Sequence, residues 1–242
     1  MKSYIAIAAA SLVVLGLFFL QVNPTVVNLR GTAKEVPDYN MYVFAVQWGK
    51  TMCLQGGSSC ENKLANIPKN EMSIHGLWPS LLSGGRLPDC NQGSEISIVD
   101  DGSSTFLSAR KYWPSLTGGN EKFWNHEYNK HGYCYSNKIQ DFDYKNYFQK
   151  TLDVFQEKKI NTLILDTFGT QSGNYAVSLS TLKSKLNEQL GGEYYSLACK
   201  TISKKQYLQE IRFSLDLDFK FIDNNLSSNC SGKKDILIPY RK

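Results

Sequence analysis

Alternation of apolar and polar positions is clearest near the C-terminus of the chain. From residue 211 to residue 221 every second side chain is apolar, and the residues between them are charged or polar. Side chains on a strand point to opposite faces in turn, so this pattern predicts a half-buried antiparallel strand over Ile211–Phe221. The aromatic and β-branched run Met41–Trp48 predicts another strand, which ends at Gly49. A last short strand is expected over Ile236–Ile238.

Helical spacing dominates the middle of the chain. It predicts helices over Phe123–Cys134 and Tyr144–Lys159, and a further amphipathic helix over Ser180–Leu190 that Gly191 caps. With helices in the middle and strands toward both ends, the chain is predicted to form an α+β domain.

The other central segments predict loops within a single domain. Pro79 is expected to end the short segment Ile74–Trp78, and Ser80–Ser104, which is rich in Gly, Ser and Asp, is predicted to form a surface loop. No linker-like stretch divides the chain. We therefore expect an N-terminal extension at 23–40 and one domain at 41–242.

The N-terminus has the layout of a secretory signal. Lys2 precedes an uncharged apolar stretch, Ile5–Leu20, which a polar segment follows. Residues 1–22 are therefore expected to be a signal peptide, with an uncleaved signal-anchor as the alternative. The protein would be secreted or delivered to a lysosome or vacuole, with no stable membrane association once the signal is cleaved.

Composition and cysteine content narrow the class of protein. The 242 residues are 42% hydrophobic and 12% aromatic, which supports a well-buried core and excludes a disordered chain. A formal net charge of +5 permits a polyanionic substrate but falls short of a dedicated DNA-binding protein. Six cysteines in an exported chain predict three disulfides, for which fifteen pairings exist. Cys53 and Cys60 are expected to close a local loop, and a catalytic cysteine is the alternative.

Two sequons for N-glycosylation begin at Asn225 and Asn229. Both fit an exposed loop of an exported protein. A disulfide at Cys230 would compromise the second sequon, because Cys230 is its middle residue.

The three histidines of the chain lie in two short tryptophan-containing segments. His75 lies in the first segment, and His126 and His131 lie in the second with Glu127 and Lys130. On an α-helix these four side chains of the second segment would span about 140° and face a common cleft. Histidines five residues apart do not fit the zinc-protease helix, which needs a spacing of four. The cysteines are too widely spaced for a structural zinc site. The chain has no Gly-x-Ser-x-Gly elbow, which argues against a serine hydrolase. No metal or other cofactor is therefore expected.

Two histidines, a lysine and a glutamate can cleave RNA without a metal. One base must deprotonate the 2′-hydroxyl, one acid must protonate the departing 5′-oxygen, and a cation must stabilise the charge on the phosphate. Histidine suits both proton roles because its ordinary pKa is about 6.5. DNA lacks the 2′-hydroxyl, so DNA should not be cleaved.

Both segments resemble the active-site signatures of the T(2)-type ribonucleases, a family of exported, often acid-active RNA endonucleases that includes the plant self-incompatibility ribonucleases. His75–Pro79 carries the first signature, His-Gly-Leu-Trp-Pro, intact. Phe123–Cys134 matches the second signature at all but one position, where Tyr133 replaces the usual Thr. The resemblance extends from about Tyr42 to the C-terminus.

The resemblance implies a fold, an activity and a set of site residues. The fold would be an α+β domain in which helices pack around an antiparallel sheet, with disulfides Cys53–Cys60, Cys90–Cys134 and Cys199–Cys230. The activity would be cleavage of single-stranded RNA through a 2′,3′-cyclic phosphate to a 3′-phosphate, and we expect a monomer. The implied roles are general base for His131, general acid for His75, stabilisation of the pentacoordinate state for Glu127 and Lys130, and phosphate binding for His126.

Base recognition is less defined. Trp78, Phe123 and Gln47 match positions that stack on or contact bases in the family, and core packing is the alternative for the two rings. Ser80 stands where many members have an acidic residue that helps to read a base, so base preference stays open. Trp48 is expected in the core.

Two other functions compete with an exported ribonuclease. A catalytically silent relative that acts as a secreted binding or signalling glycoprotein would be expected to lack a catalytic histidine, and none is missing. A metal-dependent phosphodiesterase would lose activity in a chelator. The ribonuclease should have an acidic pH optimum, because one histidine must be protonated while the other is not.

Overall fold

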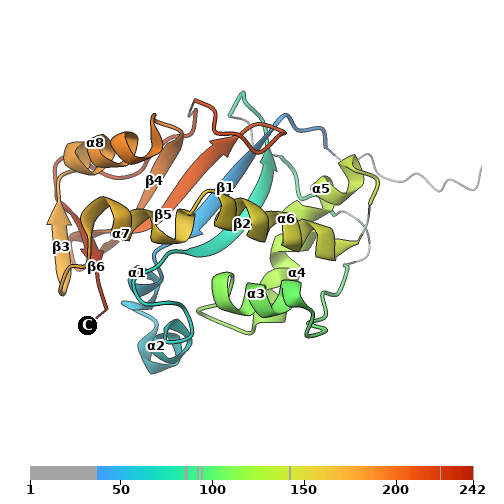
Figure 1. Cartoon of the computed structure of the whole chain (residues 1–242), viewed down its shortest axis with the longest axis horizontal. Coiled ribbons are helices and arrows are strands. Elements are labelled where there is room, and N and C mark those ends of the chain that lie inside the picture. The colour runs from blue at the N-terminus through green and yellow to red at the C-terminus, as the bar shows by residue number, and fades with distance from the viewer. Residues whose placement is uncertain are drawn as a thin grey trace, which may run out of the picture. The chain divides into compact units, whose positions relative to one another are not determined.

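The structure is a computed structural model that describes residues 37–241 except 85, 86, 92, 94, 142 and 224. The described residues belong to one compact unit (Figure 1). The predicted signal peptide at 1–22 and residues 23–36 of the predicted extension lie outside them. Among the described residues, no helix has both the length and the apolar character that a membrane crossing needs.

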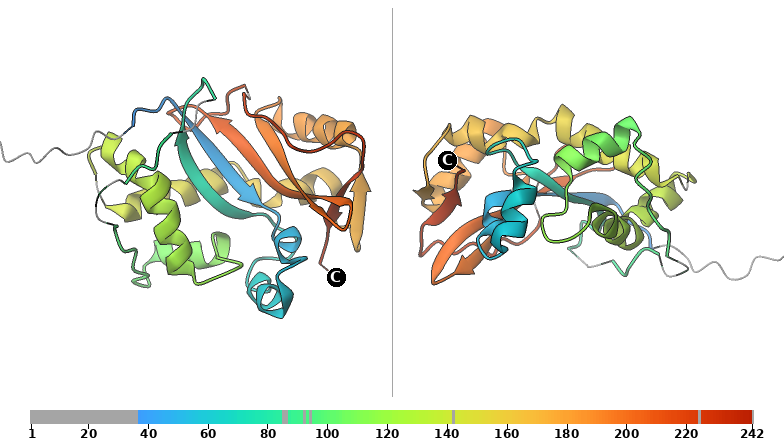
Figure 2. Two further views of the ribbon diagram at one scale, coloured as in Figure 1. Left: turned by 180° about the vertical axis from the view of Figure 1, so that it is seen from behind. Right: turned by 90° about the horizontal axis from the view of Figure 1, so that it is seen from below.

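Six strands of the described residues form one sheet, ordered β2-β1-β5-β6-β3, with β4 paired to β5 (Figures 1 and 2). Their bounds are β1 (Met41–Gln47), β2 (Ser73–Ser80), β3 (Asn174–Val177), β4 (Tyr195–Ile202), β5 (Lys205–Leu215) and β6 (Ile236–Pro239). The strands pair antiparallel except β5 and β6, which pair in parallel. The α+β class is confirmed, but the sheet is mixed rather than wholly antiparallel.

The central strand β5 differs from the predicted strand Ile211–Phe221. It ends at Leu215, because the Asp216 carboxylate accepts the backbone N–H groups of Asp218 and Lys220 and forms a turn. The strand is also covered on both faces, since Ile211 on one face and Ser214 on the other are fully buried. The prediction of a half-buried strand to residue 221 was therefore wrong, although its first half holds.

The edge strand β2 corrects the expectation that Pro79 ends the segment before it. Residues Tyr42 and Pro79 are paired across β1 and β2, and β2 continues to Ser80. An edge strand tolerates proline because one side of its backbone has no partner strand.

The helices are α1 (Gly49–Cys53), α2 (Gly57–Leu64), α3 (Ser104–Tyr112), α4 (Asn120–Glu127), α5 (Tyr133–Lys138), α6 (Tyr144–Glu157), α7 (Leu163–Phe168) and α8 (Leu179–Leu190). The last of these ends at Gly191 in the left-handed conformation, as predicted. The predicted helix Phe123–Cys134 is interrupted by a π turn, Tyr128–Gly132, between α4 and α5. Helices α6, α7 and α8 cover one face of the sheet, and the left view of Figure 2 shows the sheet from its other face.

Disulfides connect the loops to this frame with the implied pairing, Cys53–Cys60, Cys90–Cys134 and Cys199–Cys230. Backbone hydrogen bonds from Cys90 to Lys130 and from Asn91 to Asn129 fasten the loop before α3 along the π turn. This loop lies within the predicted surface loop Ser80–Ser104. Trp48 is buried, as expected.

Candidate active site

Strand β2 presents His75 at the open face of the fold. The ring Nδ1 lies 2.6 Å from Glu210 Oε1 on β5, and Nε2 lies 3.8 Å from Glu127 Oε1 on α4. The backbone carbonyl of His75 accepts a hydrogen bond from Trp113 Nε1 at 2.7 Å, which fixes the strand beneath the ring. These contacts fix the ring, and because 30% of the His75 side chain is exposed, a ligand can still reach it.

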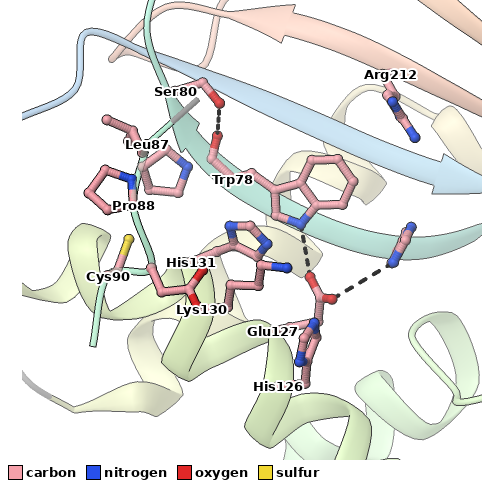
Figure 3. Close-up of a pocket in the computed structure, with 13 residues that line it drawn as sticks. Trp78, Ser80, Leu87, Pro88, Cys90, His126, Glu127, Lys130, His131 and Arg212 are labelled. Atoms are coloured by element: carbon pink, nitrogen blue, oxygen red, sulfur yellow. Dashed lines mark hydrogen bonds and ion pairs between the residues drawn. The ribbon is translucent and has the colours of Figure 1, made fainter. Parts of the chain in front are cut away.

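Gly76 explains why the first signature needs a glycine. A Cβ at this position would overlap Glu127 Oε2 and Trp78 Nε1, so only glycine lets the carboxylate approach the strand. The two groups that meet over Gly76 form a hydrogen bond in which Trp78 Nε1 donates to Glu127 Oε2 at 2.8 Å (Figure 3). The signature therefore positions Glu127 as well as His75.

The helical segment contributes the other side of the site. His126 and Glu127 lie at the end of α4, and Lys130 and His131 lie on the π turn. A π turn has more residues per turn than an α-helix, so residues five apart lie closer to a common face than the 140° arc predicts. A Cβ at Gly132 would lie 2.7 Å from the Tyr147 ring, so glycine lets this turn pack on α6.

The two sides enclose a pocket of about 520 Å³ (Figure 3). The rings of His75 and His131 both contact Trp78, with ring centroids 5.1 and 5.3 Å from the indole. Neither histidine is fully buried. The predicted catalytic and phosphate-binding residues all line this one pocket: His75, His126, Glu127, Lys130 and His131.

Burial dominates the electrostatics of Glu127. The residue is 1% exposed. Burial raises the pKa of its carboxyl to about 7, although the charge of His75 and the hydrogen bond from Trp78 act in the opposite direction. Glu127 therefore titrates near neutral pH, where a carboxyl can exchange a proton.

The two histidines with resolved shifts differ in direction. Burial alone would lower the pKa of His75, but the hydrogen bond to Glu210 and the charges of Glu127 and Glu210 raise it above its ordinary value. Burial and the neighbouring charge of Lys130 lower the pKa of His126. The site thus favours an imidazolium at His75 and a neutral ring at His126.

The three predicted base-binding residues are divided between two pockets. Trp78 lines the large pocket, and its ring is partly exposed. Gln47 and Phe123 line a second pocket of about 140 Å³, which also adjoins His75. The ring of Phe123 lies 5.9 Å from that of His75, whereas Gln47 is buried and lies 3.5 Å from the Ile74 carbonyl oxygen.

Sequence reasoning missed Glu210, which stands one residue before the predicted strand. Arg212 is one of the charged residues predicted on the face of that strand opposite the apolar side chains, and its side chain is 40% exposed. In the structure Glu210 is 2% exposed, and Arg212 lines the large pocket with its guanidinium 5.7 Å from the Trp78 ring. A glutamate two residues from an arginine on one face of an apolar strand was the available signal.

Two further expectations concern metals and glycans. Within the described part of the chain, no group of three or more His, Cys, Asp or Glu is arranged to hold a metal ion. Asn225 and Asn229 are both exposed. The side-chain amide of Asn225 donates to the Leu82 carbonyl and that of Asn229 to the Cys199 carbonyl, and Cys230, the middle residue of the second sequon, is in a disulfide.

Comparisons with known proteins agree with this geometry. Residues 39–230 match the Ribonuclease T2 family. Ribonuclease T2-like 1-A of Candida albicans is 31% identical over 189 residues, which are 69% of this chain and 47% of that protein. Ribonuclease Rh of Rhizopus niveus is 30% identical over 157 residues, which are 59% of this chain and 60% of that protein. The matched part thus spans about half of the length of these relatives.

A protein of known structure has a similar fold. A variant of RNase MC1, a protein from the seeds of bitter gourd, was solved in complex with 5′-GMP. It matches with a TM-score of 0.65 and 25% identity, covering 81% of this chain and 98% of the other. Because the family match covers most of the chain and includes both signature segments, the protein belongs to the ribonuclease T2 family.

Proposed function

We propose that the protein is a metal-independent endoribonuclease that cleaves single-stranded RNA through a 2′,3′-cyclic phosphate to a 3′-phosphate. The observation that carries the proposal is that His75, His131, Lys130 and Glu127 line one open pocket. Two imidazoles on opposite sides of a cleft, with a cation and a carboxyl beside them, are the groups that transesterification of RNA requires.

In the first step His131 acts as the base and His75 as the acid. The 2′-oxygen gives its proton to His131 and forms a bond to phosphorus. The bond from phosphorus to O5′ breaks, and O5′ takes the proton of His75 Nε2. The products are a 2′,3′-cyclic phosphate and a free 5′-hydroxyl. The raised pKa of His75 supports its role as the acid.

The other side chains stabilise the charge that develops on the phosphate. Lys130 supplies a positive charge next to His131, and His126 lies at the exposed rim of the same pocket. Glu127, with its pKa of about 7, can donate a hydrogen bond to a phosphoryl oxygen in its protonated form. Each proton-transfer role is worth about 10²–10⁴ in rate.

In the second step water opens the cyclic phosphate with the two proton roles reversed. A water molecule gives its proton to the neutral His75 and adds to phosphorus, and the 2′-oxygen leaves with the proton of His131. Because each step needs one protonated and one neutral histidine, activity should have a bell-shaped pH profile with an acidic optimum.

The two pockets on either side of His75 suit two bases that flank one phosphate. Trp78 offers a stacking surface in the large pocket, and Phe123 offers one in the small pocket next to Gln47. Ser80 and Arg212 both line the large pocket. Ser80 occupies the position at which many relatives have an acidic residue that helps to read a base.

The three disulfides suit a protein of the secretory pathway. We propose that it is secreted or delivered to a lysosome or vacuole as a monomer after removal of residues 1–22. Asn225 is the proposed glycan site. Mass spectrometry of the protein expressed in a eukaryotic secretory host tests the new N-terminus and the glycan together.

Incubation of the purified protein with single-stranded RNA in EDTA tests the function. Wild type should release 2′,3′-cyclic ends and leave a DNA of the same sequence intact, and His75→Ala and His131→Ala should be inactive. Loss of wild-type activity in EDTA would indicate a metal-dependent phosphodiesterase. Absence of cleavage under every condition would indicate a silent binding protein.

A further inference from the structure

Glu210 makes a contact with His75 that the proposed mechanism does not use. The residue lies on β5, and its carboxylate is 3% exposed. One oxygen, Oε1, lies 2.6 Å from His75 Nδ1. The other oxygen, Oε2, accepts two N–H groups of Arg212 at 2.9 and 2.7 Å. Both oxygens of the buried carboxylate are therefore bonded to side chains that line the large pocket.

This arrangement keeps Glu210 ionised. Burial alone would raise the pKa of its carboxyl, but the hydrogen bond to His75 and the charges of His75 and Arg212 lower it below the ordinary value. A buried charge is costly unless its partners are well placed, and breaking such a pair usually costs several kcal/mol. A purely structural role could be met by an apolar side chain at less cost.

We propose that Glu210 is the positioning residue of His75, which fixes the ring so that Nδ1 keeps its proton and Nε2 faces the substrate. The inference rests on the proposed ribonuclease function and adds a role for Glu210 and its counter-ion Arg212. The atom that exchanges protons is then defined, because only one ring nitrogen is left for the pocket.

The arrangement serves both steps with the same nitrogen. When His75 gives its Nε2 proton to O5′, the ring becomes neutral, and Glu210 retains the proton on Nδ1. The lone pair on Nε2 then points into the pocket, where it accepts the proton of the attacking water in the second step. Glu210 stays an anion throughout and loses no proton.

Glu210 and Glu127 both contact the His75 ring, but they face different ring nitrogens and differ in pKa. Glu127 Oε1 lies 3.8 Å from Nε2, which is too long for a hydrogen bond, so this side of the ring stays available to a leaving oxygen. Glu127 also has a pKa of about 7, whereas that of Glu210 is lowered. The anion that is permanent at neutral pH therefore contacts Nδ1, and the carboxyl that titrates lies beside the substrate.

The charge on His75 depends on groups from two sides of the site. The titratable and charged side chains that face the pocket around it are Asp89 from the loop before α3, Glu210 and Arg212 from β5, His126 and Glu127 from α4, and Lys130 and His131 from the π turn. The two glutamates favour the imidazolium and Arg212 opposes it. Removal of the Glu210 charge alone should therefore lower the pKa of His75.

Nuclear magnetic resonance of the ring nitrogens tests the inference without any assay of activity. The chain has three histidines, so ¹⁵N-labelled histidine gives a simple spectrum, and His75→Gln identifies the signals of His75. In wild type above the pKa of His75, we expect the neutral tautomer with the proton on Nδ1. A proton on Nε2 in that state would overturn the proposal, and this measurement needs no Glu210 variant to fold.

Kinetics separates an effect on the acid from general damage. Glu210→Gln should cut RNA cleavage at neutral pH about 10-fold and move the alkaline limb of the profile to lower pH, and Glu210→Ala should cut kcat about 10²-fold with little change in KM. The 4-nitrophenyl ester of uridine 3′-phosphate has a leaving group that needs no acid, so on it both variants should keep most of their activity. Equal losses on both substrates would reject the positioning role.

Gln206→Ala is the matched control. Gln206 is also buried on β5 and bonds the Ser231 backbone, but it lines neither pocket beside His75. It should leave the pH profile and the His75 signals unchanged. If wild type cleaves neither RNA nor the 4-nitrophenyl ester, the proposed function is wrong. If wild type cleaves RNA and the Glu210 variants match its rate and pH profile, only the role of Glu210 fails.

Discussion

The strand side and the helix side of the pocket hold their histidines in opposite ways. On the strand side His75 contacts two buried carboxylates, and Glu210 is itself held by Arg212. On the helix side His126 is exposed, and the neighbouring charge with the largest effect on its pKa is the cation of Lys130. The pKa of His75 is accordingly raised and that of His126 is lowered.

This difference in pKa is what the proposed roles require, an acid at His75 and a neutral hydrogen-bonding group at His126. Environments that push titratable groups apart in pKa identify their proton roles. Here the rigid sheet supplies the buried anion Glu210, because strands β2 and β5 lie on either side of β1 and carry His75 and Glu210 at fixed positions. Helix α4 buries Glu127 toward His75, whereas His126, the residue before it on the same helix, is exposed.

The largest expected effect compares the two histidines directly. His75→Ala should lower kcat/KM for RNA by about 10³-fold or more, because it removes the proposed proton donor. His126→Ala should lower it only about 10-fold, mainly through KM, since an exposed phosphate contact contributes ground-state binding. Steady-state kinetics at several pH values measures both, and equal losses in the two variants would contradict the assignment of acid and phosphate contact.

Much of this comparison was accessible from the sequence. Both signature segments and the residues His75, Glu127, Lys130 and His131 were identified from motif and spacing, and the structure brings them to one pocket. The pairing of the three disulfides follows from the family resemblance. Local pattern and motif chemistry suffice where the residues of a site lie close together in the chain.

The remaining features depend on contacts that local pattern does not record. The partner of His75 lies 135 residues away in the chain, so no spacing rule connects Glu210 to it. Alternation continued past Leu215, but the side chain of Asp216 bonds two backbone N–H groups and makes a turn there. Similarly, Gly132 lets a wider turn pack against Tyr147, which helical spacing cannot predict.

The next effect concerns the meeting point of the two sides. Gly76→Ala places a methyl group where Glu127 Oε2 and Trp78 Nε1 lie, so the hydrogen bond between them must break. We expect a loss of about 10²-fold in kcat/KM, since Glu127, a proposed catalytic group, is displaced. Thermal unfolding should also show a destabilisation of about 1–3 kcal/mol from steric overlap. Gly119→Ala at the N-terminus of α4 is the control, because nothing lies within 4 Å of a Cβ there.

Glu127→Gln tests the raised pKa of the buried carboxyl through the pH dependence of the free energy of unfolding. The folded pKa of about 7 exceeds the ordinary value of 4.5, so the folded state binds more protons and wild-type stability falls as pH rises between these values. A glutamine cannot ionise, so the variant should gain about 3 kcal/mol over wild type near pH 8 and little near pH 4. Urea unfolding at both pH values measures this gain. Activity should fall at the same time, and a variant less stable than wild type near pH 8 would show that Glu127 is needed as an anion for folding.

The smallest expected effect tests the helix side alone. The like charge of Lys130 contributes to the lowered pKa of His126, after burial of the ring, so Lys130→Gln should raise the pKa of His126. Labelled histidine spectra across a pH titration measure the change in each ring separately. The Nδ1 tautomer of His75 should persist in this variant, because Glu210 and Arg212 hold that ring from β5. If Lys130→Gln switched the tautomer of His75, Glu210 and Arg212 would not be sufficient to fix that ring.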